Sequence, residues 1–122
     1  MANKTAALDF LRLAAAGHVD EAYAKFVSPR LVHHNAYFAG DVDTLKAAMR
    51  DSARQNPAAH LDVKRAVEEN DVVAVHSHMR LQPDTPGIAV VHLMRFENGR
   101  IVEWWDIGQQ LPADSPNHNG VF

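Results

Sequence analysis

The sequence predicts a single α+β domain in which helices precede an antiparallel sheet. Apolar residues recur with helical spacing as far as residue 55, and after Pro57 they alternate with polar residues as in strands. Asn98-Gly99 then signals a tight hairpin turn between two apolar segments. In such a domain the helices cover one face of a curved sheet, which can enclose a pocket. The chain has the length of one domain, residues 1–122.

Three helices are expected in the first half of the chain. The first covers residues 5–16 and stops at Gly17. The second begins at once with Asp20 as its cap, and the third begins at an Asp43 cap and runs up to Asn56. Each carries an apolar stripe, so all three are expected to pack on the sheet.

The expected strands suggest that both faces of the sheet are covered. A short extended segment at residues 31–41 enters a loop before the third helix, and longer strands are expected at residues 60–70, 71–82, 87–97 and 100–109. The last two are continuously apolar, as when neither face meets water. Because the helices cover only one face, we expect a second copy of the chain on the other, in a homodimer.

Composition excludes several kinds of partner and cofactor. A net charge of -3 provides no broad positive surface for nucleic acid. No apolar run is long enough to span a bilayer, and the start of the chain lacks a signal peptide's apolar block, so a cytoplasmic protein is expected. Cysteine is absent, which rules out disulfides and thiolate chemistry. No phosphate-loop, nucleophile-elbow or zinc-protease motif is present, so no cofactor is expected.

One carboxylate, Asp106, lies in a predicted strand that is otherwise apolar. If the Asn-Gly pair forms the turn, Leu93 lies opposite Trp104 and Val91 opposite Asp106, and paired residues share a face. Desolvation on this apolar face would raise the pKa of Asp106 and make it useful as a general base or acid near neutral pH. The alternative is that Asp106 only ends its strand and accepts backbone hydrogen bonds.

Histidine is abundant, with eight residues, and two of them form a pair on one strand. His76 and His78 are two positions apart, so both project from the same face. With His34 or His92 as a third ligand they would suit a metal ion. A neutral histidine that donates a hydrogen bond to a carbonyl, or relays a proton, is the favoured interpretation, and no metal is expected.

Four segments together resemble the SnoaL-like group of the NTF2-like superfamily, often described as predicted aldol-condensation enzymes. They are "LVHHN" at 31–35, "DVVAVHSH" at 71–78, "MRFENGRIVEWWDIGQ" at 94–109 and the ending "NHNGVF" at 117–122. The resemblance implies a cone-shaped α+β barrel: three helices on a strongly curved sheet, an interior pocket, and a dimer formed through the outer sheet face. It also suggests that residues 119–122 fold back over the pocket mouth or the dimer seam.

The resemblance assigns roles to individual residues. Asp106 matches the acid/base of polyketide cyclases of this type, which need no cofactor, and His34 and His76 match recurrent pocket positions. Two departures are visible. Trp104 stands where the group commonly has histidine, and His92 where it commonly has an acidic residue. These changes could alter the substrate, fill the pocket or abolish catalysis.

The first functional hypothesis is therefore a cofactor-independent acid/base enzyme that acts on a small hydrophobic carbonyl compound. Asp106 would remove an α-proton, while His76 and His34 would donate hydrogen bonds or relay the proton. The residues expected to shape the apolar pocket are Tyr23, Phe26, Leu93 and Trp104. The second hypothesis is a non-catalytic module that binds a small ligand or mediates dimerisation, because one scaffold can serve either purpose.

Overall fold

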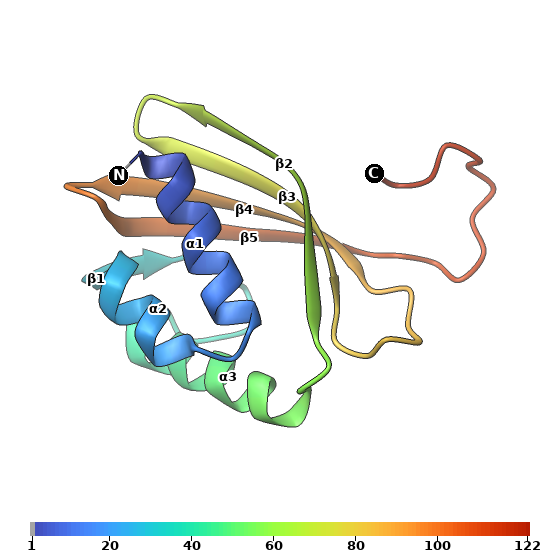
Figure 1. The fold of residues 1–122 in the computed structure, drawn as a ribbon, viewed down its shortest axis with the longest axis horizontal. Helices are drawn as coiled ribbons and strands as arrows, with labels where there is room; N and C mark the ends of the chain where they lie inside the picture. Colours follow the sequence, from blue (N-terminus) through green and yellow to red (C-terminus); the bar gives the residue numbers. More distant parts are fainter. Residues whose placement is uncertain (1) are drawn as a thin grey trace.

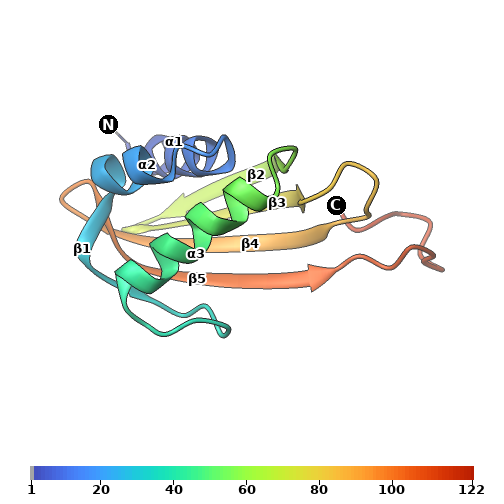
Figure 2. The same cartoon turned by 90° about the horizontal axis from the view of Figure 1, so that it is seen from below.

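The computed structural model describes residues 2–122 and confirms the α+β fold class. In chain order the elements are α1 (Asn3–Ala15), α2 (Val19–Phe26), β1 (Val27–His33), α3 (Val42–Gln55), β2 (His60–Glu69), β3 (Val72–Arg80), β4 (Ile88–Glu97) and β5 (Arg100–Gln110). The helices lie on one side of a curved sheet (Figures 1 and 2). Among these residues no helix is long and apolar enough to cross a membrane.

The caps of two helices differ from expectation. The N-cap of α2 is His18, so Asp20 lies inside the first turn, where a negative charge favours the helix dipole. The N-cap of α3 is Asp41, whose carboxylate accepts a hydrogen bond from the Thr44 backbone N–H at 2.8 Å, and the predicted Asp43 cap is wrong. Asp41 has the extended backbone of an N-cap, and the Thr44 hydroxyl also donates to its carboxylate.

The sheet has the strand order β1-β5-β4-β3-β2, with β1 parallel to β5 and the other neighbours antiparallel. The chain passes from α2 directly into β1, which begins earlier than the expected extended segment. Pro29 is tolerated there because β1 is an edge strand. α1 packs over β2 and β3, and α3 lies along β1.

A β-bulge interrupts the hairpin of β4 and β5. Ile101 pairs with Phe96, as predicted from the Asn-Gly turn, but Glu103 pairs with Arg95. Val102 is therefore an extra residue on β5 without a partner on β4. Side chains alternate between the faces of a sheet, so one extra residue exchanges the faces of every residue beyond it.

The bulge corrects the predicted pairing of Asp106. Asp106 pairs with His92, and Trp104 pairs with Met94 instead of Leu93. Asp106 and Trp104 therefore lie on the face that the helices cover, together with the buried Met94, while Leu93 lies on the opposite, outer face. An apolar setting for Asp106 was expected, but the neighbours named for it on β4 were wrong.

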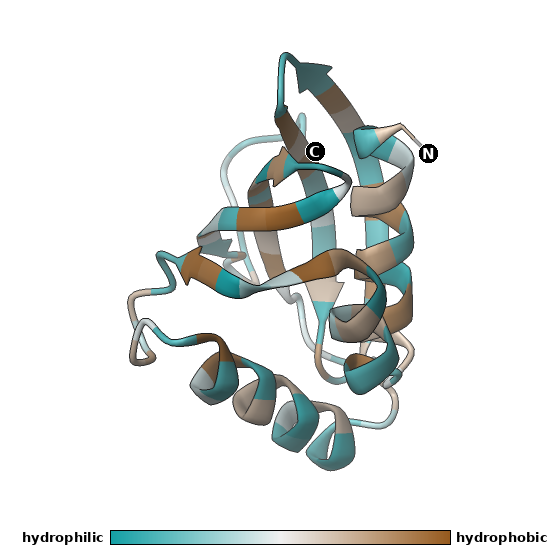
Figure 3. Ribbon diagram, turned by 90° about the vertical axis from the view of Figure 1, so that its left-hand side faces the viewer, coloured by the Kyte–Doolittle hydropathy of each residue, from teal (hydrophilic) through white to brown (hydrophobic). Residues whose placement is uncertain are grey.

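The core lies between the helices and the covered face of the sheet. Its fully buried large side chains include Phe10, Val73, Val75, Met94 and Ile101. Hydrophobic and hydrophilic bands alternate along the strands and along α1 (Figure 3), as expected for elements with one covered face. This arrangement directs every second residue of β4 and β5 toward the space beneath the helices.

The C-terminal tail crosses back toward the sheet and ends on its outer face (Figure 1). The ring of Phe122 lies 4.7 Å from that of His78 and 5.4 Å from that of His76, centroid to centroid. The ammonium group of Lys64 lies 5.2 Å from the centre of the same ring. The tail therefore covers part of β2 and β3 from outside and does not cover the interior cavity.

Candidate functional site

A cavity of about 300 Å³ lies between α1, α3 and the covered face of the sheet. Most of its lining is apolar, contributed by Phe10, Leu11, Ala14, Ala15, Phe38, Leu45, Ala48, Met49, Ala53, Ala59, Leu61, Met79, Leu81 and Trp104. The polar lining residues are Asn35, Ser52, His60, His92 and Asp106. A mostly apolar cavity with a few convergent polar groups has the character of a ligand site.

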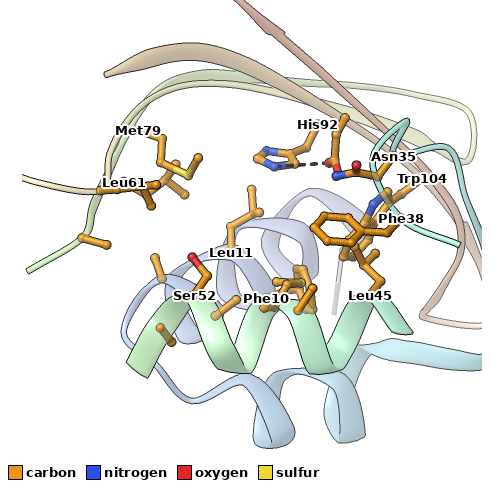
Figure 4. A pocket seen from close by; sticks show the side chains of 18 of the residues that line it. Phe10, Leu11, Asn35, Phe38, Leu45, Ser52, Leu61, Met79, His92 and Trp104 are labelled. Carbon is orange, nitrogen blue, oxygen red and sulfur yellow. Dashed lines mark hydrogen bonds and ion pairs between the residues drawn. The ribbon is translucent and has the colours of Figure 1, made fainter. Parts of the chain in front are cut away.

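Three polar side chains meet at one end of the cavity (Figure 4). The Asn35 side-chain amide donates a hydrogen bond to Asp106 Oδ2 at 2.9 Å. The other carboxylate oxygen, Oδ1, lies 3.5 Å from Nε2 of His92. The side chains of His92 and Asp106 are only 15% and 20% exposed, so water screens this pair weakly.

A short turn after β1 holds Asn35 in place. Its backbone N–H donates to Nδ1 of the buried His33 at 3.2 Å, and His33 Nε2 donates to the Ala39 carbonyl at 2.7 Å. The Asn35 side-chain oxygen in turn accepts from the Tyr37 backbone N–H at 3.0 Å. These contacts fix the side-chain rotamer of Asn35 and direct its amide group at Asp106.

Burial sets the protonation of two groups near this end. Burial lowers the pKa of His92, although the charge of Asp106 opposes the shift, so the imidazole is neutral at physiological pH. Burial, with a smaller contribution from Asp106, raises the pKa of Tyr23 above its usual range. The Tyr23 hydroxyl therefore stays protonated, and it donates to the Met49 sulfur at 3.0 Å.

Three buried polar atoms of this end have no hydrogen-bond partner among residues 2–122. They are Asp106 Oδ1, His92 Nδ1 and Trp104 Nε1. An unpaired buried polar group costs about 1–3 kcal/mol. A ligand that supplied both a donor and an acceptor here would relieve this cost, which favours a polar contact at this end of the cavity.

The family of the chain is shown by sequence. A model of the SnoaL-like domain matches residues 7–104. The chain belongs to the SnoaL-like family. The match ends just before Asp106, so the position of this carboxylate in the SnoaL-like domain comes from the structure and not from the matched region. No curated protein matches the chain.

Solved structures share the fold at low identity. IdmH from Streptomyces antibioticus, a proposed polyketide cyclase, superimposes with a TM-score of 0.72 at 17% identity, covering 88% of this chain and 92% of that one. AclR from Streptomyces galilaeus, a proposed hydroxylase, gives 0.74 at 19% identity, with 88% of each chain covered. An NTF2-like protein of unknown function from Cytophaga hutchinsonii gives 0.73 at 13% identity, with 89% and 91% covered. These similarities show the NTF2-like fold.

Only part of the predicted site comes together in this SnoaL-like domain. Asp106 and Trp104 line the cavity. Tyr23 and Phe26 are buried in the core, where the Tyr23 ring lies 6.2 Å from that of Trp104 and supports it from behind. Leu93 lies on the outer face because of the bulge and does not line the cavity.

The two histidines expected in the site lie on the outer face of the sheet. His76 alternates along β3 with the buried Val75 and Ser77, so it points away from the helices and contacts Arg65 and the C-terminal ring instead. His76 therefore lies outside the cavity. The structure does not bring three metal-binding side chains together anywhere in residues 2–122.

His34 also lies outside the cavity. Its ring stacks on Trp105 with centroids 5.0 Å apart, and its Nε2 donates to Glu103 at 2.7 Å. The preceding residue, His33, takes the buried position, which leaves His34 on the opposite side of the chain. Because side chains alternate along an extended chain, His33 points inward and His34, the predicted site residue, points outward.

The sequence interpretation did not assign His92 and Asn35 to the acid/base site. His92 was noted as a departure from the family pattern and as a third metal ligand, but only the bulge places it opposite Asp106. Asn35 belongs to the quoted "LVHHN" segment, and its distance of 71 positions from Asp106 left no local signal of their contact. A polar residue at the end of a strand that enters a loop was the one available hint.

Proposed function

We propose that this protein is a cofactor-independent acid/base enzyme that acts on a small hydrophobic carbonyl compound. The observation that carries the proposal is the state of the Asp106 carboxylate in an apolar cavity. One oxygen is held by Asn35, and the other has no hydrogen bond. A buried base that is oriented through one oxygen and lacks a hydrogen bond at the other can accept a proton once a ligand reaches that oxygen.

In the proposed reaction Asp106 Oδ1 removes a proton from the carbon next to the carbonyl group. The electron pair of the C–H bond forms a carbon–carbon double bond, and the carbonyl π electrons move to oxygen to give an enolate. The Trp104 indole N–H is a donor without a partner, two residues from Asp106 on the same face, and would stabilise the developing negative charge. Low local polarity strengthens such a contact.

His92 has a supporting role in this scheme. In its Nε2–H tautomer the neutral ring would donate toward Asp106 Oδ1 and hold the carboxylate in position. The 3.5 Å separation is long for a hydrogen bond, and such contacts often shorten when a substrate binds. His92 thus takes the place in the scheme that was expected for His76 and His34.

An aldol step would complete the chemistry. The enolate carbon attacks a second carbonyl carbon, a carbon–carbon bond forms, and the resulting alkoxide recovers the proton held by Asp106. Every atom and electron is retained, so neither a metal nor a cofactor is required by this scheme. The proposed polyketide-cyclase role of the structural relative IdmH supports an aldol reaction over other enolate reactions.

Hydrogen–deuterium exchange tests the first step without knowledge of the product. Ketones and β-dicarbonyl compounds are incubated with the protein in D₂O, and loss of the α-proton signal is followed by NMR. We expect exchange above the buffer rate with the wild type and none with Asp106→Asn. Asp84→Asn, an exposed carboxylate in the loop after β3, is the matched control. Equal exchange by the wild type and Asp106→Asn would refute the base assignment.

A non-catalytic ligand-binding module is the second candidate. Trp104 favours it, because a buried indole occupies the position where the family commonly has a titratable ring, and only His92 then lies beside Asp106 among the cavity-lining histidines of residues 2–122. Under this alternative, carbonyl ligands bind and are protected in the cavity, and no compound exchanges its α-protons. Titration followed by the exchange assay on the same compounds separates the two functions.

We also propose that the protein forms a homodimer through the outer face of the sheet. Ile107 is 55% exposed there, beside Trp105 and Val91 of the same face. Arg95 and Glu103 add charges of both signs, which suits a two-fold contact of the surface with itself. Light scattering should give the mass of two chains, and Ile107→Lys should give one. A wild type that is monomeric at micromolar concentration would contradict the dimer.

A further inference from the structure

We propose that the substrate is a neutral, narrow carbonyl compound of one or two rings, bound with its carbonyl group against Trp104 and Asp106 and its apolar part toward Leu61 and Met79. The carbonyl assignment rests on the function proposed above. The size, charge and orientation of the ligand are inferred from the dimensions and the lining residues of the cavity. Four-ring skeletons and charged acids or amines are excluded by this inference.

The length of the cavity follows from α3, which forms one of its walls. Leu45 and Ala53 both line it and are eight residues apart, so the cavity extends for about 12 Å along the helix axis. Figure 4 shows Leu45 near the polar end, and it shows Ser52, the residue before Ala53, on the side of Leu61 and Met79. The ligand is therefore expected to lie parallel to α3.

The volume restricts the width. Dividing 300 Å³ by this length leaves a mean cross-section of about 25 Å². An apolar cavity of about 150 Å³ holds one benzene ring, so about 300 Å³ holds roughly two rings. A two-ring ketone meets this limit, and a four-ring one exceeds it.

The charges of the lining select a neutral ligand. No lysine or arginine is among the lining residues, so a carboxylate or phosphate would face Asp106 without a compensating cation. An amine could pair with Asp106, but an ammonium group accepts no hydrogen bond and would leave the Trp104 N–H unsatisfied. A carbonyl oxygen satisfies that N–H, and the adjacent C–H reaches Asp106 Oδ1.

The two ends of the cavity give the ligand a direction. The far end is bounded by Leu61, Met79 and Leu81, and Leu81 is 42% exposed. The exposed His60 lies beside them, so this end opens to solvent and admits the ligand. The carbonyl group therefore enters first and the apolar part follows.

Binding and exchange measurements test the inference separately. Calorimetric titrations would use α-tetralone as the two-ring ketone, a four-ring ketone, and the carboxylate and amine analogues of the two-ring compound. We expect α-tetralone to bind at least tenfold more tightly than each of the others. A four-ring or charged compound that binds equally or more tightly, or the failure of α-tetralone to bind, would overturn the inference.

A variant of the far end tests the orientation. Met79→Ala removes atoms from the apolar boundary, so binding of the four-ring ketone should improve at least fivefold relative to that of α-tetralone. Val67→Ala, at a residue 64% exposed on the same sheet, is the control and should leave the ratio unchanged. If circular dichroism shows that Met79→Ala is unfolded, Leu61→Ala replaces it. An unchanged ratio in the folded variant contradicts the orientation.

The same compounds separate this inference from the proposed function. If α-tetralone binds in the expected order but its α-protons never exchange, the size and charge limits stand and the acid/base function fails. If the four-ring ketone exchanges faster than α-tetralone, the acid/base function stands and the size limit fails.

Discussion

On each face of the sheet a histidine lies next to a carboxylate. The two pairs differ in how many hydrogen bonds the carboxylate accepts. On the outer face, Glu103 accepts from His34 at 2.7 Å and from Arg95 at 3.1 Å. On the covered face, Asp106 has one hydrogen bond, from Asn35, and a 3.5 Å contact with His92. Satisfied charges near water stabilise a surface, whereas an incompletely satisfied pair beside a cavity is available for chemistry.

The electrostatics of the pairs differ in the same way. The hydrogen bond from His34, followed by that from Arg95, holds the pKa of Glu103 below its usual value. For His92, burial is the largest influence and lowers the pKa, against the attraction of Asp106. The outer carboxylate thus favours its charged form, while the inner histidine is kept neutral.

The largest effect is expected from the inner carboxylate. Asp106→Asn should lower the rate of α-proton exchange by a factor of about 10²–10⁴, the usual contribution of a general base, whereas Glu103→Gln should change it less than twofold. The measurement is NMR exchange in D₂O at saturating ketone. Comparable losses in both variants would show that the two pairs are not functionally distinct.

The next effect concerns the buried donor. Trp104→Phe keeps an aromatic ring in contact with Phe10 and removes the indole N–H. The exchange rate should fall about 10–10²-fold, because one hydrogen bond to a developing oxyanion is lost, while the affinity for α-tetralone changes by less. Rate and binding constants measured on one sample provide the comparison. Equal losses in the exchange rate and in the affinity for α-tetralone would indicate that Trp104 acts only through packing.

The third effect is on acid stability. Because the folded pKa of His92 is below its unfolded value of about 6.5, the unfolded chain binds more protons as the pH falls below that value. The contribution of neutral His92 is complete above about pH 6.5 and is lost as the pH decreases. The free energy of unfolding in urea should therefore decline less between pH 7.5 and 5.5 in His92→Gln than in the wild type. Parallel declines would contradict this explanation.

The smallest effect belongs to the outer pair. The folded pKa of Glu103 is below its ordinary value of 4.5, so the stabilisation it provides is present above that pH and lost as the pH falls below it. Glu103→Gln should lower the urea midpoint slightly at pH 7 and not at pH 3. High salt should reduce the difference in urea midpoint between the wild type and Glu103→Gln at pH 7, since exposed ion pairs are screened. A salt-independent loss would indicate a packing role.

The order of helices and strands and the position of the hairpin turn were predicted from local signals. Helical spacing, strand alternation and the Asn-Gly pair each depend on residues close together in sequence, so the pairing of Phe96 with Ile101 was correct. The common face of Trp104 and Asp106 was correct for the same reason, because residues two apart on a strand share a face.

The partners of Asp106 depend on distant parts of the chain. The bulge at Val102 has no local signal, yet it moves Asp106 to the face of Phe96 and Ile101 and opposite His92. Asn35 reaches Asp106 only after the turn around His33 has folded. The sequence alone thus determined the order of helices and strands and singled out Asp106 as the candidate base. Only the tertiary structure decided which groups surround it, because side-chain alternation turns a single inserted residue into an exchange of faces.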